Sequence, residues 1–201
     1  LGRSDNPGRA AMYDEIVRWE KENTGVAVLG RLGFENAYGL AVTQQTAERY
    51  GLESIADLAA VAPQLTIGGD PEWFERPEWT AVRDAYGLRF GEQRTYSPTF
   101  MYDALISGEA DAISAYTSDG RIAAENLVVL SDPREALPSY DAIVLISPRL
   151  AGDDAIADAL QPLLGSVDVA TMRQANYAVD RQDDKWPPER AADWLLKQVA
   201  R

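Results

Sequence analysis

The sequence predicts an α/β fold, and two observations carry this prediction. Segments with the character of strands alternate with segments of helical periodicity from residue 26 to residue 148. After residue 148 only helical patterns follow. Alternation of this kind is typical of layered α/β folds whose strands are mostly parallel. The sequence contains no internal repeat or low-complexity segment that would favour another class.

The first half of the chain opens with an amphipathic helix over residues 10–23, where Met12, Ile16 and Trp19 recur at helical spacing. Strands are expected over residues 26–33, 37–43, 65–70 and 89–96. Helices are expected over residues 43–51, 54–63 and 77–88. In the second of these helices Ser54 is followed three residues later by Asp57, which predicts a capping box.

The second half begins with a helix over residues 98–109, capped by Ser97, with Phe100, Ala104 and Leu105 on one face. A strand over 111–116 then leads to a helix that begins at Asp119. Two more strands are expected over residues 127–132 and 142–148. Three amphipathic helices end the chain, over residues 153–167, 168–180 and 187–200.

The charge of the chain favours some partners over others. Nineteen Lys and Arg residues face 32 Asp and Glu residues, which gives a net charge of −13. A field of this sign repels nucleic-acid backbones and anionic lipid surfaces, and it favours a cationic or zwitterionic ligand. The alternative is that the acidic surface only increases solubility. We therefore expect no nucleic-acid partner.

The absence of Cys and His narrows the chemistry further. Without cysteine the chain has no disulfide and no thiolate metal ligand, and without histidine it lacks the commonest general base. We expect no cofactor and no metal. No apolar run reaches the roughly 20 residues of a membrane helix. The polar N-terminus LGRSDNPGRA does not match a signal peptide, so an exported protein would be a mature or trimmed form.

Ligands of open α/β sheets bind beyond the carboxyl ends of the strands. Three features of this sequence follow such ends: Tyr116, the turn at Gly68 and Gly69, and Asp132. Neither GxGxxG nor GxxxxGK[ST] occurs, so a phosphate-binding loop is not expected.

Six segments, in the same order, resemble the substrate-binding proteins of ABC importers for osmoprotectants such as glycine betaine, proline betaine, carnitine and choline. They are LGFENAYGLAV (32–42), IADLAAVAPQLTIGGDPEWFERPEW (55–79), AYGLRFGE (85–92), ALISGEADAISAYTSDGRI (104–122), LVVLSDP (127–133) and LPSYDAIVLI (137–146). The resemblance implies a two-lobe fold of the type II periplasmic-binding-protein class, closing on its ligand. It also implies no catalysis, delivery of the ligand to an ABC transporter permease, and a place in the periplasm or on the outer face of the cell membrane.

The resemblance also implies the division of the chain. Residues 1–37 and 145–201 are expected to form the first lobe, which is mostly helical, and residues 38–144 the second. Family members open with a strand, a helix and a stretch resembling YPEYTGT that supplies a further cage tyrosine. Nothing in this sequence matches that opening, so we expect an incomplete first lobe and, with it, a domain-swapped dimer.

The family holds a trimethylammonium group between tyrosine rings, and the matching positions here are Tyr38, Tyr116 and Tyr140. A quaternary ammonium donates no N–H hydrogen bond, but ring faces attract it by about 0.5–2 kcal/mol per contact. The matching arginine, Arg76, is implied as the partner of a ligand carboxylate. Thr117 is counted with the ligand residues, although it also suits a helix cap.

The same residues have structural alternatives. Tyr116 would otherwise pack against the next helix, and Arg76 would form a surface salt bridge with Glu75 or Glu78. Asn36 lies two residues before Tyr38, so it would share a strand face and contact the ligand, or it would make hinge hydrogen bonds.

Further aromatic and acidic residues stay open between two roles. We expect Asp119 to cap the following helix rather than to face the ligand cation. Trp73 and Trp79 either wall the cleft or fill the core. Tyr86, Tyr96, Tyr102 and Tyr177 are interpreted as core or surface residues, and Trp19, Trp186 and Trp194 as packing residues.

The sequence leaves three alternative functions open. The first keeps the fold but changes the ligand to another betaine, such as a thiol-imidazole betaine, or to a bile-type molecule. The second is a truncated fragment that does not bind. The third is a carboxylate-pair hydrolase, which would need two acids in one cleft, and Asp119 and Asp141 are the only candidates near the proposed site.

Overall fold

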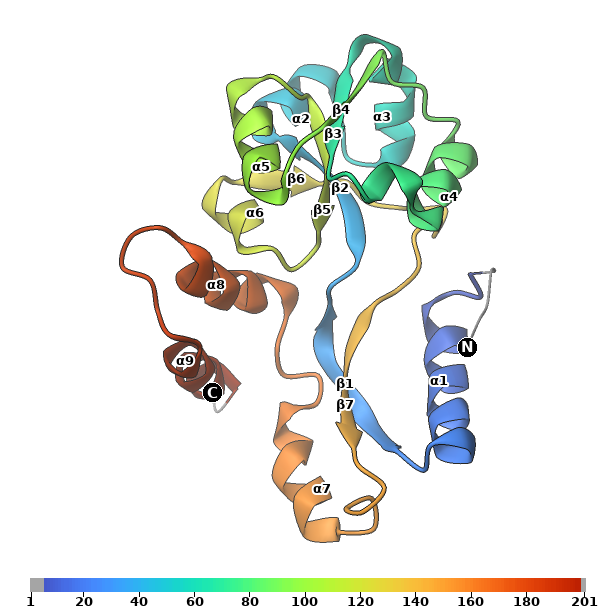
Figure 1. Ribbon diagram of the computed structural model, residues 1–201, viewed down its shortest axis with the longest axis vertical. Helices are drawn as coiled ribbons and strands as arrows, with labels where there is room; N and C mark the ends of the chain where they lie inside the picture. The colour runs from blue at the N-terminus through green and yellow to red at the C-terminus, as the bar shows by residue number, and fades with distance from the viewer. Residues whose placement is uncertain (1–5, 200–201) are drawn as a thin grey trace. The chain divides into compact units, whose positions relative to one another are not determined.

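The computed structural model describes residues 6–199, apart from the side chain of Thr99, and divides the chain into two compact units (Figure 1). Unit 1 contains the chain up to Asn36 and again from Ser139, and unit 2 is Ala37–Pro138. The outermost residues of the expected first lobe, 1–5 and 200–201, lie outside the described residues. The chain returns to unit 1 earlier than the expected residue 145, because the strand Asp141–Ile146 pairs with Ala27–Glu35.

Unit 2 is built on a five-stranded sheet with the order β4-β3-β5-β2-β6. Its strands are β2 (Tyr38–Thr43), β3 (Thr66–Gly69), β4 (Glu92–Thr95), β5 (Ala112–Tyr116) and β6 (Leu127–Val129). Strand β3 runs parallel to β4 and β5, whereas β2 runs antiparallel to β5 and β6. Four strands therefore share one direction, and β2 alone is reversed.

Five α-helices and two short 3₁₀ turns connect these strands. They are α2 (Gln44–Tyr50), α3 (Ile55–Val61), η1 (Ala62–Gln64), η2 (Trp73–Glu75), α4 (Pro77–Tyr86), α5 (Pro98–Ser107) and α6 (Gly120–Ala124). The predicted capping box at Ser54 and Asp57 is confirmed, since each side chain accepts from the other residue's backbone N–H. The predicted cap at Asp119 is confirmed as well.

The core of unit 2 lies on both faces of the sheet, as the alternation of side chains along each strand requires. In β2, Leu40 and Val42 pack with α3 and α4, whereas Ala41 packs with α5 and α6. Figure 1 shows the two helix pairs on opposite sides of the sheet. Trp73 and Trp79 are 0% and 2% exposed in the first of these clusters, so the core interpretation of both is correct.

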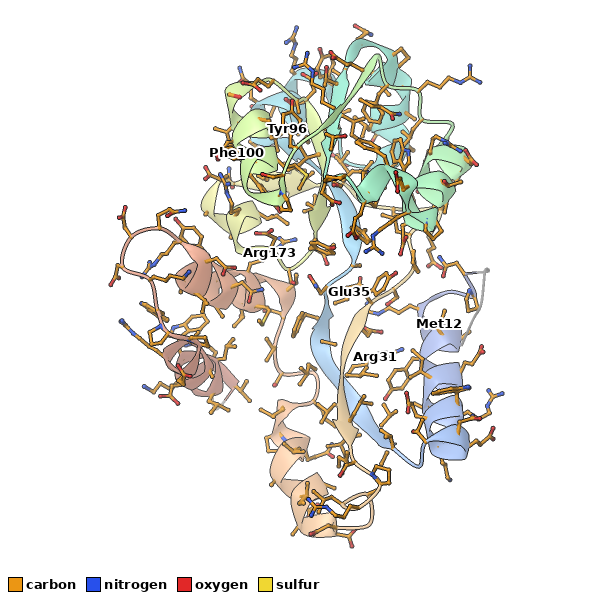
Figure 2. The ribbon with its side chains drawn as sticks, viewed as in Figure 1. Met12, Arg31, Glu35, Tyr96, Phe100 and Arg173 are labelled. Atoms are coloured by element: carbon orange, nitrogen blue, oxygen red, sulfur yellow. The ribbon has the colours of Figure 1, made fainter. Side chains whose placement is uncertain are left out.

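Helix α5 departs from its predicted face. Ala104 and Leu105 are buried as predicted, but Phe100 is 65% exposed (Figure 2). The buried face instead contains Met101 and Tyr102, which precede the other pair at helical spacing. The Ser97 side chain accepts no capping hydrogen bond from the described residues, although the helix begins directly after it.

Unit 1 is a two-stranded antiparallel sheet of β1 and β7 with helices beside it. Its elements are α1 (Arg9–Asn23), β1 (Ala27–Glu35), β7 (Asp141–Ile146), α7 (Asp154–Leu160), η3 (Gln161–Leu163), α8 (Val169–Asp180) and α9 (Pro188–Val199). The chain after η3 passes close to β1. Gly33 there has φ +119°, and a Cβ added to it would stand only 2.7 Å from the Val167 carbonyl oxygen. Glycine is required at this position, because a side chain would meet the backbone.

Among the described residues, unit 1 has far fewer buried hydrophobic residues than unit 2. Its described buried hydrophobic residues are mostly small, namely Ile146, Val167, Ala175, Ala178 and Ala191. Trp19 is 38% exposed and Leu145 is 50% exposed. The expectation that Trp19 is a packing residue is therefore correct only in part. Among the described residues, no helix combines the length and the apolar character needed to cross a membrane.

An ion cluster joins α1 to the β1–β7 sheet. Arg9 Nε donates to Asp141 Oδ1 over 3.0 Å, and Arg31 Nε lies 2.8 Å from Asp141 Oδ2. The Arg31 guanidinium also lies 3.9 Å from the ring centroid of Tyr13, so it extends from β1 towards α1 (Figure 2). Burial acts to raise the pKa of Asp141, but the hydrogen bond and charge of Arg9, then those of Arg31, outweigh it and lower the pKa.

Replacing Asp141 by asparagine is expected to lower the free energy of unfolding by roughly 1.5–3 kcal/mol at neutral pH, since charge-assisted hydrogen bonds contribute about that much. The folded-state pKa of Asp141 lies below its unfolded value, so its contribution is present above about pH 4 and is lost as the pH falls through the folded pKa. Urea unfolding at several pH values should show wild type and Asp141→Asn converging in acid. Asp84→Asn, at a carboxylate 62% exposed, is the control and should change little.

Candidate ligand-binding site

Tyr38 and Tyr116 meet at one edge of the sheet in unit 2, the edge formed by the carboxyl ends of β3, β4 and β5. Tyr38 begins β2 and Tyr116 ends β5, and they are register partners in the antiparallel pair. Their hydroxyl oxygens are 2.8 Å apart and share a hydrogen bond, and their ring centroids are 4.7 Å apart. Because β2 is reversed, its first residue reaches the edge where β3, β4 and β5 end. Two predicted cage residues are thereby brought together.

The two rings differ in exposure. Tyr38 is only 8% exposed, with the Trp73 ring at 4.8 Å and the Arg76 guanidinium at 5.4 Å from its centroid. Burial, and then the hydrogen bond to Tyr116, raise the pKa of Tyr38 well above its ordinary value. Tyr116 is 41% exposed. Tyr38 therefore orients its partner, and Tyr116 keeps part of its ring surface exposed.

The turn after β3 brings acidic side chains to the same edge. An added Cβ at Gly69 would stand 2.6 Å from Trp73 Cδ1, so the turn needs glycine to let the indole ring pack. Asp70 Oδ1 accepts from the backbone N–H groups of Glu72 and Trp73 over 2.8 and 3.0 Å. The loop is thus closed by its own carboxylate.

A hollow of about 430 Å³ lies at this edge. Tyrosines, carboxylates and small or apolar residues line it: Tyr38, Asp70, Pro71, Glu72, Pro98, Met101, Tyr102, Ser114, Ala115, Tyr116 and Asp119. Among the described residues, the lining includes three carboxylates and no basic side chain. Such a hollow is suited to a positively charged group.

Arg76 lies beside the hollow rather than in its lining. Its Nη2 is 3.1 Å from Glu72 Oε2, so it forms a salt bridge with an acid that the sequence did not single out, and the charge of Glu78 acts on it as well. The backbone of Arg76 also precedes α4, whose first residue is Pro77. No ligand carboxylate is needed to account for this position of the guanidinium.

The other predicted site residues are divided between the units. The Thr117 hydroxyl oxygen accepts from the Ala37 N–H over 3.1 Å, and the Thr117 N–H donates to the Ala37 carbonyl over 2.8 Å. Thr117 therefore closes the β2–β5 pair. Asn36 and Tyr140 belong to unit 1, where the Asn36 N–H donates to the Tyr140 carbonyl over 3.0 Å. Tyr140 is 43% exposed.

The expectation that Asn36 shares a strand face with Tyr38 is wrong. Strand β1 ends at Glu35 and β2 begins at Tyr38, so Asn36 and Ala37 lie between the strands and the alternation of faces is interrupted. The hydrogen bond of Asn36 to Tyr140 matches the alternative role in the connection between strands.

The three acids singled out in the sequence have structural partners. Asp119 accepts from the Arg121 N–H over 2.9 Å and caps α6. Asp132 accepts from the Tyr86 hydroxyl and the Leu137 N–H. Asp141 is held by two arginines of unit 1. Within residues 6–199, no group of three or more acidic side chains is arranged to hold a metal ion.

Sequence reasoning missed several lining residues. Tyr102 was interpreted as core or surface, and it is both buried, at 3% exposure, and part of the lining. Pro98, Met101 and Tyr102 are spaced i, i+3 and i+4 on α5, which is the signal that places them on one face. The Arg121 guanidinium lies 5.0 Å from the Tyr102 centroid and pairs with Asp103 over 2.6 Å.

The chain is similar to proteins that bind small solutes for transport. Residues 9–197 match the family described as the substrate-binding domain of ABC-type glycine betaine transport systems. The carnitine transport binding protein of Listeria monocytogenes is 32% identical over 151 residues, which are 74% of this chain and 49% of that protein. The glycine-betaine-binding protein of Pseudomonas aeruginosa is 29% identical over 199 residues, which are 92% of this chain and 63% of that protein.

A solved structure agrees with this match. The crystal structure of a glycine betaine/carnitine/choline ABC transporter protein has a TM-score of 0.89 and 28% identity, and the match covers all of this chain and 72% of that one. The predicted α/β fold of the type II periplasmic-binding-protein class is confirmed. The chain spans about half the length of the carnitine-binding relative. Both sequence relatives are transport proteins, in agreement with the prediction of a binding protein rather than an enzyme.

Proposed function

The chain belongs to the family of substrate-binding domains of ABC-type glycine betaine transport systems, and we propose that it binds a quaternary-ammonium solute such as choline, glycine betaine, proline betaine or carnitine. We further propose that it delivers this solute to an ABC transporter permease. In this role the protein works in the periplasm or on the outer face of the cell membrane.

One observation carries the choice of ligand. The hollow of unit 2 is lined by tyrosine rings and three carboxylates, with no basic side chain among its described lining residues. A trimethylammonium group is large, positive and weakly hydrated, and it has no N–H to donate. Ring faces and a negative field therefore suit it better than a set of hydrogen-bond acceptors does.

The roles within the site follow from exposure. Tyr116 supplies the ring that contacts the cation, and Tyr38 and Thr117 hold the backbone and hydroxyl of that segment in place. Arg76 is proposed as the partner of a ligand carboxylate when the ligand has one. Asn36 and Tyr140, which belong to unit 1, stay predictions from the sequence.

A domain-swapped dimer stays a prediction from the sequence. Its support is the small set of apolar residues that unit 1 buries and the 50% exposure of Leu145 on β7. Two-stranded sheets are marginal by themselves, and further strands or packing partners stabilise them.

Isothermal titration calorimetry and thermal unfolding of the purified chain test the proposed function. Choline, glycine betaine and carnitine are titrated separately, and at least one is expected to bind saturably and to raise the melting temperature with concentration. Other betaines, including a thiol-imidazole betaine, serve as comparison ligands. No binding of any of the three quaternary ammonium compounds would refute the proposal.

A further inference from the structure

Glu72 and Arg76 form an ion pair at the rim of the hollow. Glu72 belongs to the lining and its side chain is 77% exposed, whereas Arg76 is 39% exposed and its Nη2 lies 3.1 Å from Glu72 Oε2. The Arg76 Nε atom is buried and makes no hydrogen bond within the described residues. Of the five N–H donors of the guanidinium, one on Nη2 binds Glu72, and the buried Nε–H has no acceptor among the described residues.

We propose that Glu72 determines which quaternary ammonium solutes the site prefers, by favouring cations that carry no carboxylate. This inference rests on the proposed function, since it concerns the ligand of the same hollow. Two effects of Glu72 act in the same direction. Its charge repels a ligand carboxylate, and its hydrogen bond occupies Nη2 of the arginine that such a carboxylate would bind.

The sign of the effect differs between two ligands. Choline is a cation with a neutral hydroxyl, so the negative charge of Glu72 attracts it. It has no carboxylate with which Arg76 could form an ion pair. Glycine betaine is a zwitterion, so its carboxylate meets the charge of Glu72 and competes for Arg76. Removal of the Glu72 charge should therefore strengthen binding of glycine betaine and slightly weaken binding of choline.

Glu72 is the lining acid that can change without disturbing the fold. Asp70 closes its own loop through two backbone N–H groups, and Asp119 caps α6. The Glu72 side chain instead contacts Arg76, four residues along the chain. Its effect on the ligand can thus be separated from the stability of the loop.

Glu72→Gln is the variant that tests the proposal. It keeps the size of the side chain and removes the charge. The ratio of the dissociation constant of glycine betaine to that of choline is expected to fall roughly fivefold relative to wild type, the size of one unit-charge interaction in a wet site. Glu75→Gln is the matched control, because Glu75 is exposed at the end of η2, the turn that Glu72 precedes, and lies outside the lining. It should leave the ratio unchanged.

A second background separates the two effects of Glu72. In Arg76→Gln the arginine is no longer available, so the gain in glycine betaine affinity caused by Glu72→Gln should shrink by at least half. Melting curves of all variants establish that each is folded.

The outcomes separate this inference from the proposed function. If wild type binds neither solute, the proposed function fails. If wild type binds and Glu72→Gln leaves the ratio within twofold, the role of Glu72 is refuted while the function stands. An equal shift in Glu75→Gln would also refute it, because the effect would then be a general one of surface charge.

Discussion

Replacing Tyr116 by alanine is expected to weaken binding of choline by between about tenfold and about thirtyfold. Tyr116 is the exposed ring of the hollow, and a desolvated cation–π contact contributes up to about 2 kcal/mol. The substitution also removes the hydroxyl that shares a hydrogen bond with Tyr38. Tyr116→Phe keeps the ring and loses only that hydrogen bond, so it should weaken binding by about fivefold or less.

Calorimetric titration of choline into wild type and the two variants measures this difference. Tyr177→Ala is the control, because Tyr177 is 37% exposed, close to the 41% of Tyr116, and lies outside the lining. It should bind choline as wild type does. If Tyr116→Ala and Tyr116→Phe lose affinity equally, the hydroxyl rather than the ring face carries the contact, and the cation–π account is wrong.

The second large effect is on stability. Trp73→Ala is expected to lower the free energy of unfolding by about 3–5 kcal/mol, the usual cost of truncating a buried aromatic side chain. Trp73 is fully buried and touches the rings of Tyr38 and Trp79, with centroids at 4.8 and 5.9 Å. Its loss leaves a cavity directly behind Tyr38.

Urea unfolding of the whole chain, followed by far-UV circular dichroism, measures the loss. Trp19→Ala provides the comparison, because Trp19 is 38% exposed on α1 and its truncation should cost about 1 kcal/mol or less. Similar losses in the two variants would show that burial of Trp73 is not what stabilises unit 2.

Much of the fold could be predicted because its signals are local. The capping box at Ser54 and Asp57 and the cap at Asp119 depend on residues within a few positions of each other. The reversed direction of β2 could not be read from alternation, because alternation records the order of elements and not their direction. The pairing of β7 with β1 is likewise non-local. It places residues 139–144 in unit 1, so unit 2 ends at Pro138 rather than at the predicted residue 144.

The candidate site was predicted in part. Tyr38 and Tyr116 came from resemblance to a family, and their pairing across β2 and β5 gives that choice a geometric basis. Glu72 and Tyr102 were missed because their place in the lining depends on how the loop after β3 and helix α5 meet the sheet edge. Arg76 was expected to bind a ligand carboxylate, but its contact with Glu72 depends on the fold of one loop.

A crystal structure of the protein with choline tests the central claim most directly. We predict that the trimethylammonium group occupies the hollow of unit 2, with its nitrogen within about 6 Å of the Tyr116 ring centroid, the range of a cation–π contact. Choline bound elsewhere, with the face of Tyr116 free of ligand, would contradict the account.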